Sequence, residues 1–379
     1  MENLVAAESV PEATPPVVRR FSFGTIAIVV FFALLWLGLW RQLSGEWSVN
    51  DQYSYGWFVP FFAIILFWLR LEGRPPGRPP TPTRQSSSLQ FGIIAVALIL
   101  LFPIRLFEIA NPDWRPLSWL HAICVVTVTL AFLWSAGGVS WLRHFAFPVA
   151  FTLIAVPWVS PLEGPIVQGL MRVVAAISTE LVALFGIPAQ LEGNLIRIPN
   201  GLVGVNEACS GVRSLQTSLM IGLLFGELKR LSIFRRVMLV FAAAAIAFFG
   251  NCARAFFLVW IAATRNIATA NSWHDFAGYG IVVLVFVGSL ALAAMLGRDK
   301  VRIKKAEVKN QSADQLKSSY FLIPTFYFVA AVLWLVLVEF AAAGWYRAHE
   351  SSLVASTRWD VKWPQTAPNF RDVRIDEQV

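Results

Sequence analysis

Residues 237–261 read VMLVFAAAAIAFFGNCARAFFLVWI, and this stretch decides the fold class. It is apolar throughout except for Asn251 and Arg254 in its second half. About 20 consecutive apolar residues are enough for a helix to cross the hydrocarbon core of a bilayer. The stretch therefore predicts a transmembrane helix that carries two polar side chains, and an arginine inside such a helix needs an explanation because burying its charge is costly.

Other apolar stretches of the chain repeat this signal. Of all residues, 57% are hydrophobic and only 14% are charged, which is too little charge to cover the surface of a soluble protein of this size. We predict an all-α polytopic membrane protein with about nine transmembrane helices. Besides 237–261, the predicted spans are 22–40, 57–70, 91–107, 118–136, 145–158, 214–227, 276–296 and 321–343.

The arginines and lysines between the spans predict the orientation, since short cytoplasmic loops are enriched in them. They gather before the first span, around 70–84, at 143, at 229–236 and from 298 to 317, whereas the alternate loops carry few. This alternation requires that 166–186 does not cross, and its polar residues Gln168 and Arg172 lie roughly on one helical face. We therefore expect an interfacial amphipathic helix there, with the N-terminus in the cytoplasm and the C-terminus outside.

The net charge of +8 follows from these loops, and we find no nucleic-acid motif that would make DNA or RNA a partner. Punctuation by glycine, proline and asparagine predicts a short hairpin or ordered loop at the outer face over 189–206. The expected organisation is a disordered cytoplasmic tail (1–20), N-terminal helices (21–144) with a Pro-rich linker (72–88), a catalytic core (145–296), a basic cytoplasmic loop (297–320), a last helix (321–343) and an external tail (344–379).

The first polar motif is Asn206-Glu207-Ala208-Cys209-Ser210-Gly211-Val212-Arg213, directly before the span 214–227. With Asn206 as the N-cap, Cys209 would stand in the first helical turn, where the helix dipole stabilises a thiolate. Arg213 would add a positive charge four residues later. The alternative interpretation is a helix start with an incidental cysteine. Cys124 and Cys252 lie inside apolar stretches, where a cysteine is usually a small hydrophobic residue.

Two further polar motifs belong to the same predicted face of the membrane. Asn251 and Arg254 are three residues apart and share a helical face. His274 precedes the span 276–296, with Gly278 one turn further on. Alternatively, Arg254 snorkels to the interface and His274 is an interfacial anchor, as His121 and His144 are at other helix ends.

Together, these motifs supply a thiol, a guanidinium and an imidazole, which suit the nucleophile, the oxyanion-stabilising group and the general acid/base of acyl transfer. No metal-ligand cluster, paired carboxylates or phosphate-binding loop accompanies them. We therefore expect no cofactor and no metal.

The order of these motifs resembles the exosortase/archaeosortase family of membrane transpeptidases. The resemblance rests on Glu207 to Arg213 with its Ala-Cys-Ser-Gly block, on Asn251-x-x-Arg254 and on His274-x-x-x-Gly278, and it covers about 145–296. The span 321–343 and the tail extend beyond the usual core of the family.

The resemblance implies a cysteine peptidase or transpeptidase of the bacterial inner membrane, linked to exopolysaccharide or envelope assembly. Its substrates would be exported proteins with a C-terminal sorting signal, a transmembrane helix and a basic cluster. Cys209 would form a thioester, Arg254 would hold the oxyanion or orient the thiolate, and His274 would transfer protons. The alternatives are a transporter or channel component, with Arg254 and His274 lining a polar pathway, and a non-catalytic scaffold for polysaccharide secretion.

Overall fold

The computed structural model describes residues 23–72, 84–205, 211–297 and 325–350. The predicted tail 1–20, most of the linker 72–88, the basic loop 297–320 and most of the tail 344–379 therefore lie outside the described residues. The elements are α1 (Phe23–Val49), η1 (Asp51–Phe58), α2 (Val59–Glu72), α3 (Arg84–Ala110), α4 (Arg115–Phe151), η2 (Thr152–Ala155), α5 (Ser160–Leu184), β1 (Gln190–Glu192), β2 (Leu195–Ile198), β3 (Gly201–Gly204), α6 (Val212–Leu228), α7 (Ile233–Thr264), α8 (Ile267–Gly297) and α9 (Thr325–Glu350).

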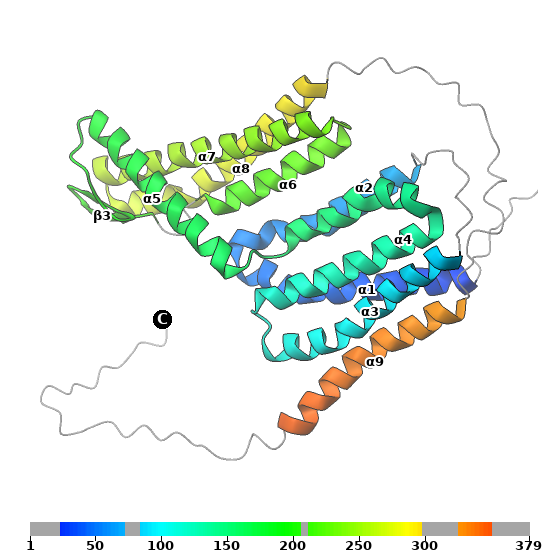
Figure 1. Ribbon diagram of the computed structural model, residues 1–379. Coiled ribbons are helices and arrows are strands. Elements are labelled where there is room, and N and C mark those ends of the chain that lie inside the picture. The colour runs from blue at the N-terminus through cyan, green and yellow to red at the C-terminus, as the bar shows by residue number, and fades with distance from the viewer. Residues whose placement is uncertain (1–22, 73–83, 206–210, 298–324, 351–379) are drawn as a thin grey trace, which may run out of the picture.

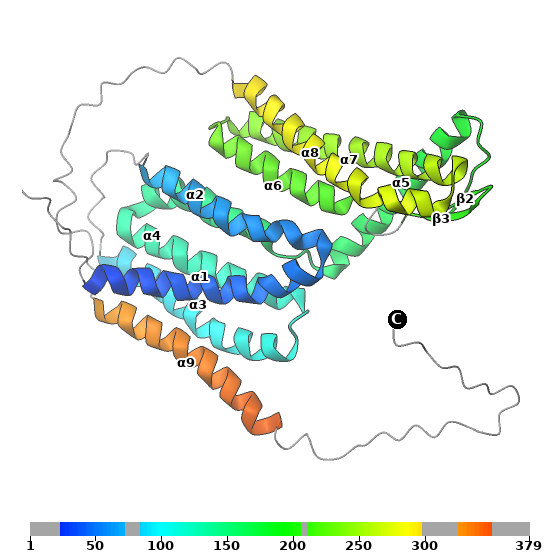
Figure 2. The same cartoon turned by 180° about the vertical axis from the view of Figure 1, so that it is seen from behind.

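The helices form two groups that lie side by side (Figures 1 and 2). In one group α1, α2 and α3 pack against α4, and α9 packs on α1 and α3; in the other α6, α7 and α8 pack against one another with α5 across α7. The groups meet where α2 and η1 contact α6. One end of the molecule carries the turn between α6 and α7, and the opposite end carries the sheet and the turn between α7 and α8 (Figure 1).

The helix α4 is two antiparallel helices joined at a glycine pair. Gly137 and Gly138 leave the helical conformation, and Gly138 has φ 67° and ψ −167°, a combination that only glycine adopts readily. The chain then runs back beside the first arm, as shown by the Trp119 indole Nε1, which donates to the carbonyl oxygen of Pro157 at 2.8 Å. The two apolar stretches predicted on either side of residue 137 are thus confirmed as separate helical arms.

Within the described residues, eight helices are long and apolar enough to cross a membrane. They include α5 and not α6, which has 17 residues. The buried face of α5 packs on the C-terminal half of α7, where Phe185 and Phe256 have ring centroids 5.5 Å apart. The all-α polytopic class is confirmed. The count of nine crossings takes the two arms of α4 separately, counts α6 and leaves α5 at the interface.

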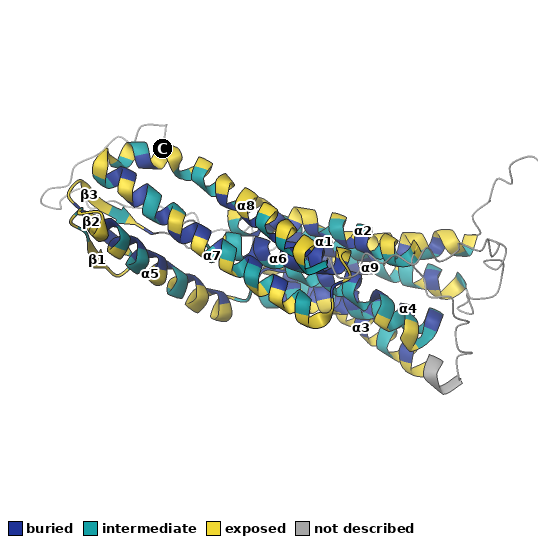
Figure 3. Ribbon diagram, turned by 90° about the horizontal axis from the view of Figure 1, so that it is seen from above, coloured by how far each residue is buried: buried dark blue, intermediate teal, exposed yellow. Residues whose placement is uncertain are grey.

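Large apolar side chains cover the outside of the molecule rather than its interior alone. Exposed residues line the outward faces of the helices along most of their length (Figure 3). Trp68 in α2, Phe241 in α7 and Phe276 in α8 are each more than half exposed. In water such a surface would drive aggregation. Its composition is that of a surface facing lipid, as the predicted class requires.

The predicted hairpin over 189–206 is a small three-stranded antiparallel sheet in the order β1-β2-β3. Ile196 and Ile198 of β2 point inward onto α5 and the end of α7, while their neighbours are exposed. Asn200, in the turn between β2 and β3, donates from Nδ2 to the last carbonyls of α7, at Ala262 and Ala263. The sheet therefore covers the C-terminal end of α7.

Three predicted boundaries were wrong. The helix α3 begins at Arg84, inside the predicted linker 72–88. The helix α8 begins at Ile267, nine residues before the predicted span 276–296, because Asn266 accepts a hydrogen bond from the backbone N–H of Thr269 (2.7 Å) and so starts the helix early. The helix α6 begins at Val212 and not after a cap at Asn206.

Candidate active site

The helix α7 presents Asn251 and Arg254 on one face, as their spacing predicts. Asn251 is 1% exposed, whereas Arg254 is half-buried. Gly250 lies beside them, and a Cβ there would come within 3.3 Å of Leu284 and Ile281 in α8. The absence of a side chain at Gly250 thus lets α7 and α8 approach closely, as small residues do between membrane helices.

The helix α8 brings His274 onto Arg254. The guanidinium Nη2 lies 3.0 Å from His274 Nε2 and 3.2 Å from the carbonyl oxygen of His274. Gly278 stands one turn further along α8, and a Cβ there would lie 3.5 Å from Nη2 of Arg254. Glycine at this position leaves the guanidinium room beside α8. The predicted grouping of Arg254, His274 and Gly278 is therefore present in the structure.

The contacts of His274 assign the positions of its protons. An arginine can only donate, so Nε2 accepts from Arg254. In the neutral ring Nδ1 then carries the proton, and it lies 3.1 Å from Oδ1 of Asp275. The His274 side chain is 30% exposed and that of Asp275 is 88% exposed. The imidazole is therefore partly accessible, and His274 stands two turns inside α8 rather than at its beginning as predicted.

The backbone that leads into α6 sits directly on Asn251. Gly211, the residue before the helix, has φ +84°, a left-handed conformation that favours glycine. A Cβ on Gly211 would lie 2.7 Å from Nδ2 and 2.8 Å from Cγ of Asn251. The end of the predicted cysteine motif and the α7 face that bears Arg254 are thus in contact.

Of the other predicted site residues in the cysteine motif, Arg213 is among the described residues and the rest are not. Cys209, Glu207 and Ser210 lie outside the described residues, as does Asn206, the predicted cap. Arg213 is exposed in the first turn of α6, and its Nη2 donates to the hydroxyl of Ser54 in η1 at 3.1 Å. Arg213 therefore links the start of α6 to the other helix group.

A polar network that the sequence interpretation missed lies at the same end of the molecule. The buried carboxylate of Glu163 accepts hydrogen bonds from Tyr53 (2.6 Å) and from Arg115. Arg115 also binds Glu46 of α1 at 3.0 Å. The network fixes η1 and the start of α5 against α4. Its signal in the sequence was Glu163 between two apolar stretches, where an acidic residue is costly unless it is paired.

The two other cysteines and His144 have different surroundings. Cys124 and Cys252 are both buried, in agreement with the interpretation that they are small hydrophobic residues. His144 Nε2 lies 2.8 Å from the carbonyl oxygen of Arg70 at the opposite end of the molecule. In the part of the chain that the structure describes, no group of three or more His, Cys, Asp or Glu side chains could hold a metal ion.

Comparison with known proteins gives one match. A family model described as transmembrane exosortase matches residues 47–293, which is more than half of the chain and contains η1 through most of α8. No curated protein and no solved structure matches the chain. The matched region includes every predicted site residue, and it leaves α9 and most of α1 outside.

Proposed function

The chain belongs to the transmembrane exosortase family, and from that premise we propose that it is a cysteine transpeptidase or peptidase with Cys209, Arg254 and His274 as its catalytic residues. The observation that carries the proposal is the contact between Arg254 and His274 across α7 and α8. Gly211 supplies the link to the cysteine motif. Two residues span at most about 7 Å of chain, and Cys209 is two residues before Gly211.

The first chemical step would be attack of the Cys209 thiolate on the carbonyl carbon of the scissile peptide bond. A new C–S bond forms and the carbonyl oxygen takes up negative charge. The Arg254 guanidinium is the cationic donor that would stabilise this oxyanion, because preorganised positive charge acts strongly in a site shielded from water. The N-terminus of α6 follows the cysteine motif and favours an anion there.

His274 would then act as the general acid and base. In the resting arrangement its Nε2 is occupied by Arg254, so proton transfer through Nε2 requires Nη2 to turn toward the oxyanion when substrate binds. When substrate binding frees Nε2, this nitrogen takes the proton of the Cys209 thiol before the attack, and the imidazolium so formed protonates the leaving amine as the C–N bond breaks, which leaves a thioester on Cys209. The same nitrogen later takes a proton from water or another acceptor nucleophile, which releases the product and restores the thiol.

The neighbouring residues have positioning roles in this proposal. Asn251 supports the backbone at Gly211, Gly278 leaves space for Arg254, and Arg213 ties α6 to η1. Glu207 and Ser210 are supporting candidates from the motif itself.

The substrates in this proposal are exported proteins with a C-terminal sorting signal, a transmembrane helix and a basic cluster. The site would face the outside of a bacterial inner membrane, and the activity would serve exopolysaccharide or envelope assembly. This orientation is supported by the charge asymmetry of the chain. Among the described residues, Arg70 is near the end of α2, Lys229 and Arg235 flank the turn between α6 and α7, and Arg143 precedes His144, which contacts Arg70; the turn between α6 and α7 lies at the end opposite the sheet.

The decisive experiment replaces Cys209 with alanine in the full chain. It is co-expressed with an exported reporter that ends in a sorting signal, an apolar helix and an arginine cluster, and processing of the reporter is followed by its change in mass. We expect Cys209→Ala to stop processing completely, while Cys252→Ala, a cysteine in the same helical group, leaves it unchanged. Normal processing by Cys209→Ala at normal protein level would overturn the enzyme proposal in favour of transport or assembly.

A further inference from the structure

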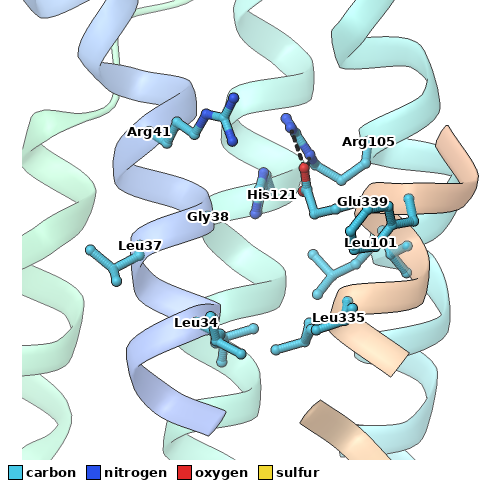
Figure 4. Close-up of a pocket in the computed structure, with 13 residues that line it drawn as sticks. Leu34, Leu37, Gly38, Arg41, Leu101, Arg105, His121, Leu335 and Glu339 are labelled. Carbon is cyan, nitrogen blue, oxygen red and sulfur yellow. Dashed lines mark hydrogen bonds and ion pairs between the residues drawn. The ribbon is translucent and has the colours of Figure 1, made fainter. Parts of the chain in front are cut away.

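A cavity of about 300 Å³ lies between α1, α3, α4 and α9, away from the candidate active site. Figure 4 shows Arg41, Arg105 and His121 at one level of the cavity, with Leu34 and Leu335 facing each other at another level. The volume is in the range of pockets that enclose small molecules. The cavity therefore has a polar end and an apolar end.

Most of the charge at the polar end is already neutralised. Arg105 pairs with Glu339 of α9 through Nε and Nη2, at 2.7 and 3.1 Å, and with Glu108 through Nη1 at 2.8 Å. Nδ1 of His121 lies 3.0 Å from the same Glu108 carboxylate. Two buried or partly buried carboxylates thus balance Arg105 and hold His121. This cluster fixes α9 to α3 and α4.

Arg41, the other arginine of the cavity, is not part of this cluster. Among the described residues it forms no salt bridge, and its side chain is exposed. The predicted span 22–40 ends directly before Arg41. We therefore expect Arg41 near the headgroup level of the bilayer, where lipid phosphates lie.

The apolar end of the cavity opens toward the outside of the helix bundle. Leu34 and Leu37 of α1 and Phe340 of α9 are 38%, 55% and 74% exposed. Gly38 lines the cavity between them, and a Cβ added to it would meet no atom within 4 Å. Gly38 therefore leaves open space on the face of α1 that lines the cavity.

We propose that this cavity binds one membrane phospholipid, with its phosphodiester on Arg41 and an acyl chain between α1 and α9. The phosphodiester would bind Arg41, the exposed guanidinium of the cavity, which pairs with neither Glu108 nor Glu339. A guanidinium binds phosphate oxygens through charge-assisted hydrogen bonds. Such a lipid would place its headgroup at the polar end of the cavity and its acyl chain at the apolar end. The proposal is independent of the proposed catalytic role, since α9 and most of α1 lie outside the region that matches the family.

The test uses the full-length protein, purified and delipidated in a neutral detergent. Palmitoyl-oleoyl phosphatidylglycerol is titrated while tryptophan fluorescence reports the thermal unfolding midpoint, because a ligand of the folded state raises that midpoint with concentration. We expect a saturable rise for the wild type. A diacylglycerol with the same chains lacks the phosphate, and inorganic phosphate lacks the chains, so neither should reproduce the rise at equal concentrations.

Two variants test the two ends of the cavity. Arg41→Gln should weaken the lipid effect by about tenfold, the size of one charge-assisted contact. Gly38→Leu places a side chain in the cavity and should abolish the saturable rise. Arg172→Gln and Gly45→Leu are the matched controls, since Arg172 is an exposed arginine on α5 and Gly45 is a glycine of α1 with open space around it. Both should behave as the wild type.

Each contrary result overturns the proposal in a different way. An unchanged titration for Arg41→Gln removes the phosphate contact, and an unchanged titration for Gly38→Leu removes the cavity as the binding place. An equal effect of diacylglycerol indicates a purely apolar site, and an equal effect of inorganic phosphate indicates an anion site without lipid. If Gly38→Leu fails to fold, Arg41→Gln against Arg172→Gln still decides.

Discussion

At the scale of residues, the guanidinium of Arg254 has a geometry that lysine cannot reproduce. Its Nη2 reaches both Nε2 and the carbonyl oxygen of His274 from a partly buried position on α7. A lysine ammonium keeps the charge, but it is a compact point charge on a flexible stem without the planar fork. The role proposed for Arg254 therefore depends on shape as well as on charge.

We predict that Arg254→Lys lowers kcat for reporter processing by about 10² to 10³-fold, the loss seen when one oxyanion donor is removed. The rate is measured with the purified variant at saturating reporter. Arg265→Lys is the control, because Arg265 is an exposed arginine that follows the same helix, and it should change the rate by less than about twofold. Equal rates for Arg254→Lys and the wild type would contradict the oxyanion role.

Gly211 gives a second prediction at this scale. In Gly211→Ala the alanine has to adopt the left-handed backbone conformation, which costs about 1–2 kcal/mol for residues other than glycine. Its Cβ also comes too close to Asn251. Gly186→Ala has the same backbone cost, at φ +79°, but meets no atom within 4 Å. We expect Gly211→Ala to lower the thermal midpoint more than Gly186→Ala and to reduce processing, which Gly186→Ala should not do. Equal effects of the two variants would show that Asn251 does not constrain the loop.

At the scale of elements, the reversal inside α4 determines where α5 begins. The second arm of α4 returns to the level of Arg115, and α5 starts beside it with Glu163 bound to Arg115. Gly138 makes this return possible, because its φ and ψ lie in a region that is nearly exclusive to glycine. A side chain on Gly137 would in addition collide with Trp141.

Gly138→Ala should therefore destabilise the protein by about 1–3 kcal/mol. The measurement is the thermal midpoint in detergent. Gly92→Ala serves as the control, since Gly92 is inside α3 with no atom within 4 Å of an added Cβ. In a helix interior this change favours folding by up to about 1 kcal/mol. A Gly138→Ala variant as stable as the Gly92→Ala variant would mean that the bend does not need glycine.

The sequence was sufficient for the elements where one physical rule dominates. Lengths of apolar stretches reflect bilayer thickness, so the arms of α4 and the core of α7 were predicted correctly. Helix beginnings were predicted less well: Asn266 caps α8 earlier than expected, and α6 begins at Val212, with Gly211 and not an asparagine before it. The left-handed conformation of Gly211 depends on packing against Asn251, which no local pattern reveals.

At the scale of the whole molecule, local sequence patterns likewise do not reveal most contacts between helices. The loop charges predicted that Arg254 and His274 share one end of the bundle, and the structure places them together. The networks around Glu163 and around Arg105 were not predicted, since their partners come from helices far apart in the sequence. The sign of these networks in the sequence was the presence of acidic residues inside or beside apolar stretches, where an unpaired charge is costly.

The orientation in the membrane is a prediction for the whole molecule. In a Cys209→Ser background, single cysteines are placed at Ser272, which is exposed at the site end, and at Lys229, which is exposed at the opposite end. Intact cells are treated with a membrane-impermeant thiol reagent. We expect labelling of Ser272→Cys in intact cells and of Lys229→Cys only after permeabilisation, because the basic end should face the cytoplasm. The reverse pattern would invert the topology and place the site inside.

The contacts among Gly211, Asn251, Arg254 and His274 come from three helices that follow one another directly in the chain. During synthesis the nascent chain can therefore assemble these contacts as soon as α8 has left the ribosome, before α9 is inserted. Such local pairing closes short loops and is expected to be fast. A nascent chain stalled after residue 324 should then already have these contacts formed, and α9 is inserted afterwards.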